Sequence, residues 1–248
     1  MENAPILSLA GISRFPGADL EAWDRYNKWL SEVYATLLMK AAERTGMDIY
    51  QIVRESPEYP SGVFFVHYLN LSAWQDARKI PESAAITEEF RNWQKRNVID
   101  YAWSGVYQLV KSFRNVRALS GTRLDSRIEN ASVMHFEAYR LSPEEQDKYN
   151  AWFAEYAVNI FMPLFMKLPG LKGYDFYKHT GFAARNDVRE TEFPASLSVV
   201  YFENIQAFEN FEKSIELETF RKTMWNVFPR GLNFKWYVQY QLTQSWRK

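Results

Sequence analysis

The chain has 248 residues, 47% of them apolar, so it is long enough to bury either one large core or two smaller ones. Its 30 basic and 30 acidic residues cancel, which argues against nucleic-acid or anionic-membrane binding and favours a neutral or apolar small-molecule partner. The lack of cysteine excludes disulfides, thiolate catalysis and cysteine-ligated metals, and the apolar run at 5–12 is too short for a signal peptide or a membrane span. We therefore expect a cytoplasmic protein with no membrane partner.

The first half of the chain alternates between strand and helix periodicity. Asp19 is a suitable N-cap for an amphipathic helix, Gly46 is expected to end that helix, and Pro81 is expected to interrupt a later helical stretch. The predicted elements are a strand at 6–14, a helix at 19–43, strands at 47–54 and 63–70, helical segments at 72–79 and 84–99, and a strand at 103–113.

The second half repeats this order after a polar stretch without apolar periodicity. Ser142 before Pro143 is a strong helix start, and Pro163 is expected to kink or end that helix. The predicted elements are a strand at 132–140, a helix from 143, strands at 173–180 and 196–203, a helix at 205–226 and a strand at 234–246. We predict a first domain at 1–115, a linker at 116–131 and a second domain at 132–248.

Short sequence patterns recur in the same order in both halves. Tyr26-Asn27-Lys28-Trp29 returns as Tyr149-Asn150-Ala151-Trp152, and Gly46-Met47-Asp48-Ile49-Tyr50 returns as Gly173-Tyr174-Asp175-Phe176-Tyr177. Ala73-Trp74 returns as Ala207-Phe208, and Ser112-Phe113 returns as Ser245-Trp246. Loop insertions in a duplicated unit explain the small drift in spacing, so we predict two copies of one unit of over a hundred residues.

The predicted order within each copy is that of a ferredoxin-like split βαβ unit. A tandem pair of such units resembles the dimeric α+β barrel superfamily, and Tyr149-Asn150-x-Trp152 followed by Leu168-Pro169-Gly170 looks like a pattern of one subgroup. The subgroup has a histidine where this chain has Ala157, so that residue's role is absent here. The resemblance implies an α+β fold in which two antiparallel sheets face each other around a small-molecule cavity, with the helices outside.

Strand alternation then predicts the cavity-facing side chains, if the apolar set of each strand packs under the helices. The polar set is concentrated in the second copy, and we expect it to form the site. These residues are His135, Glu137, Tyr139, Asp175, Tyr177, His179, Tyr237, Gln239 and Gln241, to which we add His67 of the first copy as a substrate-binding residue.

The expected chemistry is acid–base catalysis without a cofactor. His135 and Glu137 share one face of a strand, so we expect His135 to act as acid or base and Glu137 to orient it or to act beside it. Tyr139 and Tyr177 are expected to donate hydrogen bonds to developing negative charge. His179 is a further candidate catalytic residue. Asp48 and Asp175 recur in both copies, so a structural role is the alternative for Asp175.

The predicted activity is that of a lyase, isomerase or cyclase acting on a small, largely apolar, aromatic or phenolic substrate. The sequence has no glycine-rich nucleotide loop and no Gly-x-Ser-x-Gly elbow. One alternative is a non-catalytic binder of an apolar ligand. Others are a haem enzyme with His179 or His135 as axial ligand, which the superfamily suggests, and a metal centre of His135, His179 and Glu137. A homodimer through outer surfaces stays open.

Overall fold

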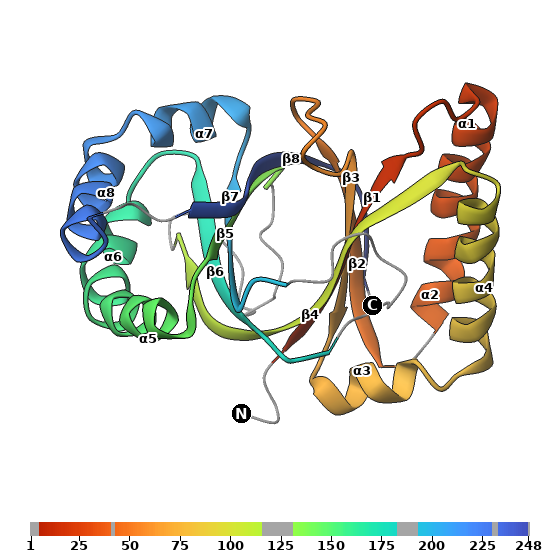
Figure 1. The fold of residues 1–248 in the computed structure, drawn as a ribbon, viewed down its shortest axis with the longest axis horizontal. Helices are drawn as coiled ribbons and strands as arrows, with labels where there is room; N and C mark the ends of the chain where they lie inside the picture. Colours follow the sequence, from red (N-terminus) through yellow and green to blue (C-terminus); the bar gives the residue numbers. More distant parts are fainter. Residues whose placement is uncertain (1–4, 41–42, 116–130, 183–192, 230–232, 248) are drawn as a thin grey trace. The chain divides into compact units, whose positions relative to one another are not determined.

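The computed structural model describes residues 5–40, 43–115, 131–182, 193–229 and 233–247 (Figure 1). Apart from Ala131, the predicted linker at 116–131 lies outside these residues. None of the helices described in these ranges combines the length and apolar character needed to cross a membrane.

The strands close an antiparallel barrel in the order β1-β3-β2-β8-β5-β7-β6-β4. Both halves run strand, helix, strand, strand, helix, strand, so the predicted α+β class and split βαβ order are confirmed. The strands are β1 (Ile6–Arg14), β2 (Arg44–Ile52), β3 (Gly62–Tyr68), β4 (Ile99–Arg114), β5 (Val133–Arg140), β6 (Leu171–His179), β7 (Ser196–Phe202) and β8 (Asn233–Arg247).

The helical segments follow the same scheme in each half, and a π-helical stretch occurs inside the first helix of both. The first half has α1 (Leu20–Trp29), π-helical η1 (Leu30–Tyr34), α2 (Ala35–Lys40), α3 (Leu71–Ala77) and α4 (Pro81–Lys95). The second has α5 (Pro143–Trp152), π-helical η3 (Phe153–Phe161), α6 (Met162–Phe165), α7 (Ile205–Glu212) and α8 (Ile215–Val227).

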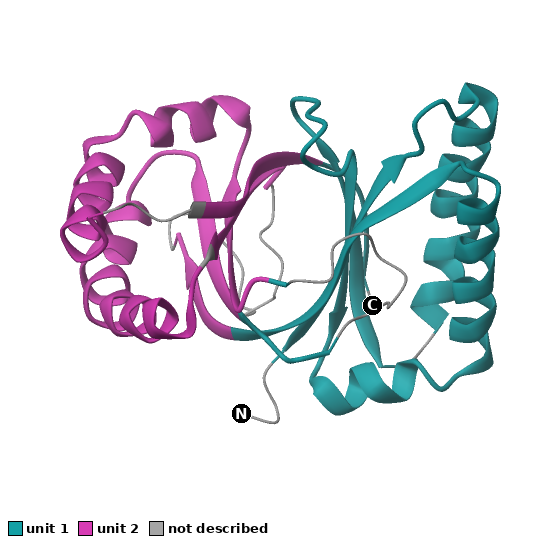
Figure 2. Cartoon of the chain, viewed as in Figure 1, with its two compact units in different colours: residues 1–109, 178–193, 242–248 teal, residues 110–177, 194–241 magenta. Residues whose placement is uncertain are grey.

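The chain divides into two compact units (Figure 2). Unit 1 contains Met1–Leu109, Lys178–Phe193 and Leu242–Lys248, and unit 2 contains Val110–Tyr177 and Pro194–Gln241. The long strands β4 and β8 therefore each continue from one unit into the other, so each unit contains the end of a strand from the opposite half of the sequence.

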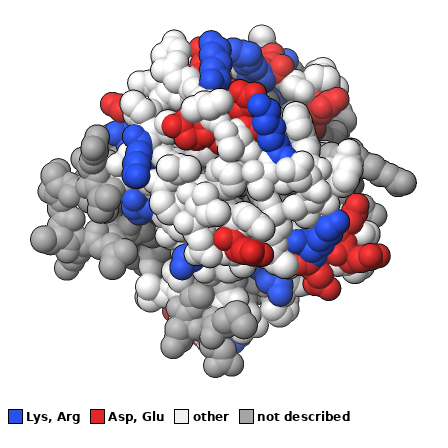
Figure 3. Space-filling view, turned by 90° about the vertical axis from the view of Figure 1, so that its left-hand side faces the viewer, with Lys and Arg blue, Asp and Glu red and all other residues white. Residues whose placement is uncertain are grey.

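Each unit has its own core between one face of its sheet and its helices. In unit 1, Tyr26 packs edge-on against Phe90 and Trp93. In unit 2, Trp152 and Phe161 pack against Phe220. The tyrosine and tryptophan of the repeated Tyr-Asn-x-Trp pattern therefore pack in the cores of both units, where these contacts join the first helix of each half to its last helix. Charged side chains of both signs are scattered over the outer face of the unit 2 helices, and neither sign gathers into a broad patch there (Figure 3).

The repeated aspartates hold the exchanged strand ends. In unit 1, Asp48 accepts a hydrogen bond of 2.7 Å from Ser245 Oγ and lies 2.6 Å from the guanidinium of Arg247. In unit 2, Asp175 accepts 2.7 Å from Ser112 Oγ and lies 2.6 Å from Arg114. Asp48 and Asp175 are buried, so each pair fixes a terminal strand segment to its unit, which agrees with the structural alternative for Asp175.

Three predicted boundaries are wrong for identifiable reasons. Gly46 lies inside β2, where a Cβ atom would meet the side chain of Arg247. Pro81 is the first residue of α4, because that position needs no N–H. The predicted helix at 205–226 is two helices, since Ser214 caps α8 by accepting from the N–H of Leu217.

The predicted capping of the Pro143 helix is confirmed. Ser142 Oγ accepts from the N–H of Glu145, and the Glu145 carboxylate accepts from the N–H of Ser142, which completes a capping box. Pro163 lies at the start of α6, and that helix ends two residues later at Phe165.

Candidate functional site

The predicted His135–Glu137 pair is present in unit 2. His135 Nε2 lies 3.0 Å from Glu137 Oε1, and the amide nitrogen of Gln239 donates to His135 Nδ1 at 2.9 Å. With Gln239 donating, the ring proton belongs on Nε2, where it is donated to the carboxylate. His135 has no exposed surface, so both ring nitrogens are satisfied in a closed environment.

The prediction was wrong about which face of the strand carries this pair. The His135 ring lies 5.2 Å from that of Phe208 in α7, so this face lies under the helices of unit 2. The opposite face, with Met134 and Phe136, is fully buried as well. The assumption that apolar side chains face the helices fails here because both faces of β5 are buried, and hydrogen bonds satisfy the polar set.

Three further predicted residues share the helix-covered side. Burial and the charge of Glu137 raise the pKa of Tyr139, which stays protonated. The Tyr237 hydroxyl donates to Glu212 Oε1 at 2.7 Å, and Arg221 also contacts that carboxylate at 2.9 Å. Tyr237 and Gln239 lie on β8 opposite Glu137 and His135 of β5. The second half therefore contains two neighbouring polar groups under its helices, His135 with Glu137 and Gln239, and Tyr237 with Glu212 and Arg221.

The other predicted residues are elsewhere. Tyr177 donates to Asp175 at 3.3 Å on the face of β6 away from the helices, and His67 of unit 1 contacts Asp48 at 2.8 Å. Gln241 is exposed. His179 belongs to unit 1, where its ring lies 5.1 Å from that of Tyr107. The structure therefore does not bring the ten predicted residues into one site.

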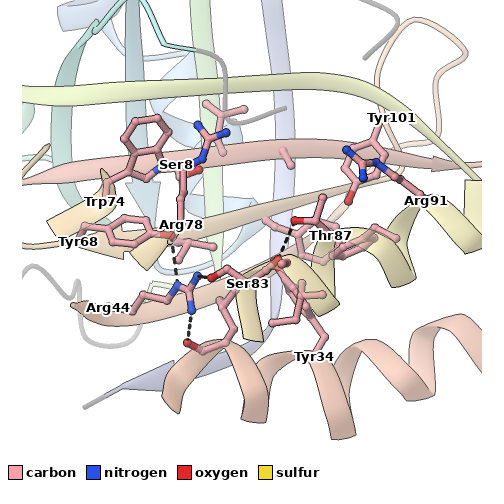
Figure 4. A pocket seen from close by; sticks show the side chains of 18 residues that line it. Ser8, Tyr34, Arg44, Tyr68, Trp74, Arg78, Ser83, Thr87, Arg91 and Tyr101 are labelled. Atoms are coloured by element: carbon pink, nitrogen blue, oxygen red, sulfur yellow. Dashed lines mark hydrogen bonds between the residues drawn. The ribbon is translucent and has the colours of Figure 1, made fainter. Parts of the chain in front are cut away.

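A large pocket lies in unit 1, between the sheet and the helices, and we name it the unit 1 pocket (Figure 4). Its volume of about 610 Å³ lies within the range typical of small-molecule sites. None of the 18 described residues that line it is a histidine or a carboxylate. Its aromatic walls are formed by Tyr34, Phe64, Tyr68, Trp74, Phe90 and Tyr101.

Arg44, the first residue of β2, is the buried cation of this pocket and is only 3% exposed. Its guanidinium donates to Leu38 O at 2.8 Å, to Ser83 Oγ at 2.7 Å and to the Tyr68 hydroxyl at 3.3 Å (Figure 4). Burial raises the pKa of Tyr68 although Arg44 opposes the shift, so the Tyr68 hydroxyl stays protonated.

Unit 2 fills the corresponding space with apolar side chains. Arg44 and Leu171 correspond, because they are the first residues of β2 and β6, which have the same length. Tyr68 and Phe202 correspond as the last residues of β3 and β7, which also have the same length. Ser83 and Leu217 correspond as the third residues of α4 and α8. All three unit 2 residues are buried members of its core. The reverse holds on the neighbouring strand. By their pairing positions, Ser8 and Ala10 of β1, which line the pocket, correspond to His135 and Glu137 of β5.

Strand alternation does not indicate the unit 1 pocket, because it concerns polar residues within strands and Arg44 precedes the predicted strand at 47–54. Arg44 lies two residues before Gly46, in the loop that the sequence was expected to form after the first helix. A comparison of the two halves at matched positions gives the missing signal, since the second half has a leucine at 171 where the first half has an arginine at 44.

A haem, which the superfamily resemblance leaves open, is held through an axial side chain such as an imidazole, and the two histidines named for that role differ in their hydrogen bonding. His135 has both ring nitrogens engaged, so it cannot act as the axial ligand. His179 accepts from the N–H of Gly181 through Nδ1 at 3.3 Å, and its buried Nε2 has no hydrogen-bond partner in the described part of the chain, so Nε2 is the histidine nitrogen open to an added group. The unit 1 pocket offers an iron no imidazole. Among the described residues no group of three metal-binding side chains occurs, so the proposed centre of His135, His179 and Glu137 is not formed.

No protein-family model and no curated protein matches this sequence. Solved structures do match over almost the whole chain. An anthrone oxidase-like protein is 13% identical with a TM-score of 0.66, covering 99% of this chain and 93% of its own. A proposed monooxygenase from Fusobacterium nucleatum is 11% identical with a TM-score of 0.61, covering 100% and 96%.

A chlorite dismutase variant from Candidatus Nitrospira defluvii is 12% identical, with a TM-score of 0.55 and coverage of 98% and 93%. At such identities the likeness concerns the fold alone. The chain therefore has the fold of the dimeric α+β barrel proteins, with all eight barrel strands supplied by one polypeptide.

Proposed function

We propose that this chain binds a small aromatic molecule in the unit 1 pocket and acts on it as an enzyme. The observation that supports this most is a pocket of about 610 Å³ with six aromatic side chains in its walls. Aromatic walls offer large apolar surfaces and favour stacked or edge-on contact with a flat ring. On this proposal, the aromatic or phenolic substrate predicted from the sequence binds in the first half of the chain, not in the second half as the sequence predicted.

The names of the structural neighbours support the same class. One is described as anthrone oxidase-like, and anthrone is a flat aromatic ketone; another is a proposed monooxygenase, a description that names no substrate. On this proposal the pocket holds the ring of the substrate and keeps water from it, while its arginine and tyrosine side chains face the polar end of the molecule.

The test uses two adjacent alanines in α4. Ala84 lines the unit 1 pocket and is exposed, whereas Ala85 is exposed but does not line it. Isothermal titration with two-ring aromatic compounds, including 2-naphthol, should give binding to the wild type and to Ala85→Trp. Ala84→Trp should bind at least roughly tenfold more weakly, because the indole fills the opening. Equal binding by both variants, or no binding to the wild type, would count against the proposal.

A second candidate is the predicted acid–base site at His135 and Glu137. Its support is the 3.0 Å contact between the two side chains, with Gln239 fixing the tautomer of the imidazole. On this reading the second half carries the proton transfer of a lyase, isomerase or cyclase. Glu137→Gln should then lower kcat by about 10²–10⁴ without lowering the thermal midpoint. A variant that keeps full turnover would eliminate this site.

The repeated sequence patterns and the equal order of elements support a further proposal, that the two halves arose by duplication of one unit. A homodimer, the absence of a cofactor, a cytoplasmic location, and the division at 116–131 remain predictions. Mass measurement by sedimentation at several protein concentrations tests the dimer, since a constant mass of about 29.3 kDa would exclude it.

A further inference from the structure

The buried guanidinium of Arg44 has no anionic partner among the described residues. Its three hydrogen bonds all go to neutral acceptors, namely a backbone carbonyl and two hydroxyl oxygens. A guanidinium has five N–H donors, so one N–H on each terminal nitrogen has no acceptor in the described part of the chain. Because burying an unpaired charge is costly, this arrangement points to an anion supplied from outside.

Tyr68 adds a second unused donor at the same place. Its hydroxyl oxygen accepts from Arg44 Nε, and its own O–H has no acceptor among the described residues, although the side chain is buried. Figure 4 shows the Tyr68 hydroxyl and the Arg44 guanidinium side by side, with Ser83 on the other side of the arginine. An oxygen anion near these groups receives charge-assisted hydrogen bonds from both residues.

The other charged residues that line the pocket are also basic. Arg78 and Arg91 also line the pocket, and the guanidinium carbon of Arg78 lies 4.8 Å from the centre of the Trp74 ring. Arg91 is paired with Glu88 at 3.3 Å, so it contributes little net charge, whereas Arg44 has no such neighbour. Unit 2 replaces Arg44, Tyr68 and Ser83 by apolar residues and has a packed core there, which ties the three polar residues to the pocket rather than to the fold.

We infer that the ligand of the unit 1 pocket is an aromatic carboxylate whose acidic group is bound by Arg44 and Tyr68. This inference rests on the proposed function, because it names the substrate class of the same pocket. The aromatic walls take the ring, and the carboxylate takes the free N–H groups of Arg44 and the O–H of Tyr68. A planar guanidinium and a carboxylate match in geometry, which an ammonium group does not reproduce.

The wild-type test compares 2-naphthoate with its neutral isostere 2-naphthamide by isothermal titration calorimetry. The acid should bind at least roughly tenfold more tightly than the amide, since a hydrogen bond to a charged group contributes more than a neutral one. Equal binding of the two compounds would overturn the inference and leave the proposed function standing. Failure of both compounds to bind would remove the proposed function itself.

Variants then assign the effect to named side chains. Tyr68→Phe, which copies Phe202 of unit 2, should weaken the acid several-fold and leave the amide within about twofold. Arg44→Met should remove the preference for the acid, and Arg44→Lys should restore only part of it. Arg25→Met is the matched control, because Arg25 is an exposed arginine of the same unit paired with Glu21. An unchanged acid preference in both Tyr68→Phe and folded Arg44→Met would assign the anion to another site and overturn the inference.

Discussion

At the residue scale, the buried charged side chains differ in whether they have an oppositely charged partner. Asp48 and Asp175 each have an arginine and a serine as partners, and neither lines the unit 1 pocket. Arg44 is the contrasting case, since its partners are all neutral. A buried charge with a complete set of partners holds the fold together, whereas one with unused donors marks a binding site.

Asp48→Asn tests the structural role. Burial by itself raises the pKa of Asp48, but the hydrogen bond and charge of His67, with Arg247 and Ser245, hold the pKa below its usual value. A carboxylate with a lowered pKa stabilises the fold at neutral pH, and this contribution is lost as the pH falls through the folded-state pKa. We expect Asp48→Asn to cost about 3 kcal/mol near neutrality, measured by urea unfolding.

Urea unfolding at several pH values tests the direction of the Asp48 pKa shift. The stability difference between wild type and Asp48→Asn should shrink below about pH 4, where the unfolded carboxyl takes up its proton. Asp76→Asn is the control, because Asp76 is exposed and paired with Lys79 on the surface. It should leave the unfolding midpoint unchanged. A pH-independent difference for Asp48→Asn would contradict the assigned ion pair.

At the element scale, the layer between sheet and helices is built in two ways. Unit 1 leaves a pocket at Arg44, Tyr68 and Ser83, and unit 2 closes the matching place with Leu171, Phe202 and Leu217. The two units therefore share one set of strands and helices but differ in what that layer contains. The two halves therefore diverge in the layer between sheet and helices.

The triple variant Arg44→Leu/Tyr68→Phe/Ser83→Leu tests this difference. It copies the unit 2 residues into unit 1, so it should abolish binding of 2-naphthoate. Thermal stability should be unchanged or raised, because replacing a buried charge and its hydrogen-bond partners together by apolar groups is often neutral or stabilising. Calorimetric titration and a thermal melt measure both properties. Retained binding would contradict the placement of the ligand, and a large fall in melting temperature would show that Arg44 serves the fold.

Much of the fold was predictable at this scale, because strands and helices depend on local periodicity. The helix cap at Ser142 depends only on neighbouring residues, and the structure contains it. Tyr149 and Trp152 of the repeated pattern are one helical turn apart, and both are buried in the unit 2 core. Pro81 was misjudged because its effect depends on position, being disruptive inside a helix but favourable in the first turn. Boundaries that depend on a cap are therefore harder to predict than the elements themselves.

The candidate site was less predictable, because it depends on which strand face the helices cover. His135 and Glu137 were correctly paired, since residues two apart on a strand share a face. Their face was wrong, because polarity alone does not distinguish an open cavity from a closed, hydrogen-bonded layer. Arg44 has no local pattern at all. Its partners Ser83 and Tyr68 lie 39 and 24 residues away in sequence, so only the folded chain brings the three together.

At the scale of the whole molecule, one polypeptide supplies all the barrel strands, yet its halves are not equivalent. A pocket with Arg44 occurs in unit 1, whereas the matched residues of unit 2 belong to a packed core. Titration should therefore give one molecule of 2-naphthoate bound per chain. The control is the triple variant, which should bind none. A stoichiometry of two would contradict the assignment of binding to one half.

The most direct test of the central claim is a crystal structure of the chain with 2-naphthoate bound. We expect the ring between β3 and α4 of unit 1, near Phe64 and Phe90, with its carboxylate on Arg44 and Tyr68. Density for the ligand at that place would establish the pocket and its anchor together. A naphthoate bound instead beside His135 and Glu137 in unit 2, with the unit 1 pocket empty, would contradict the account.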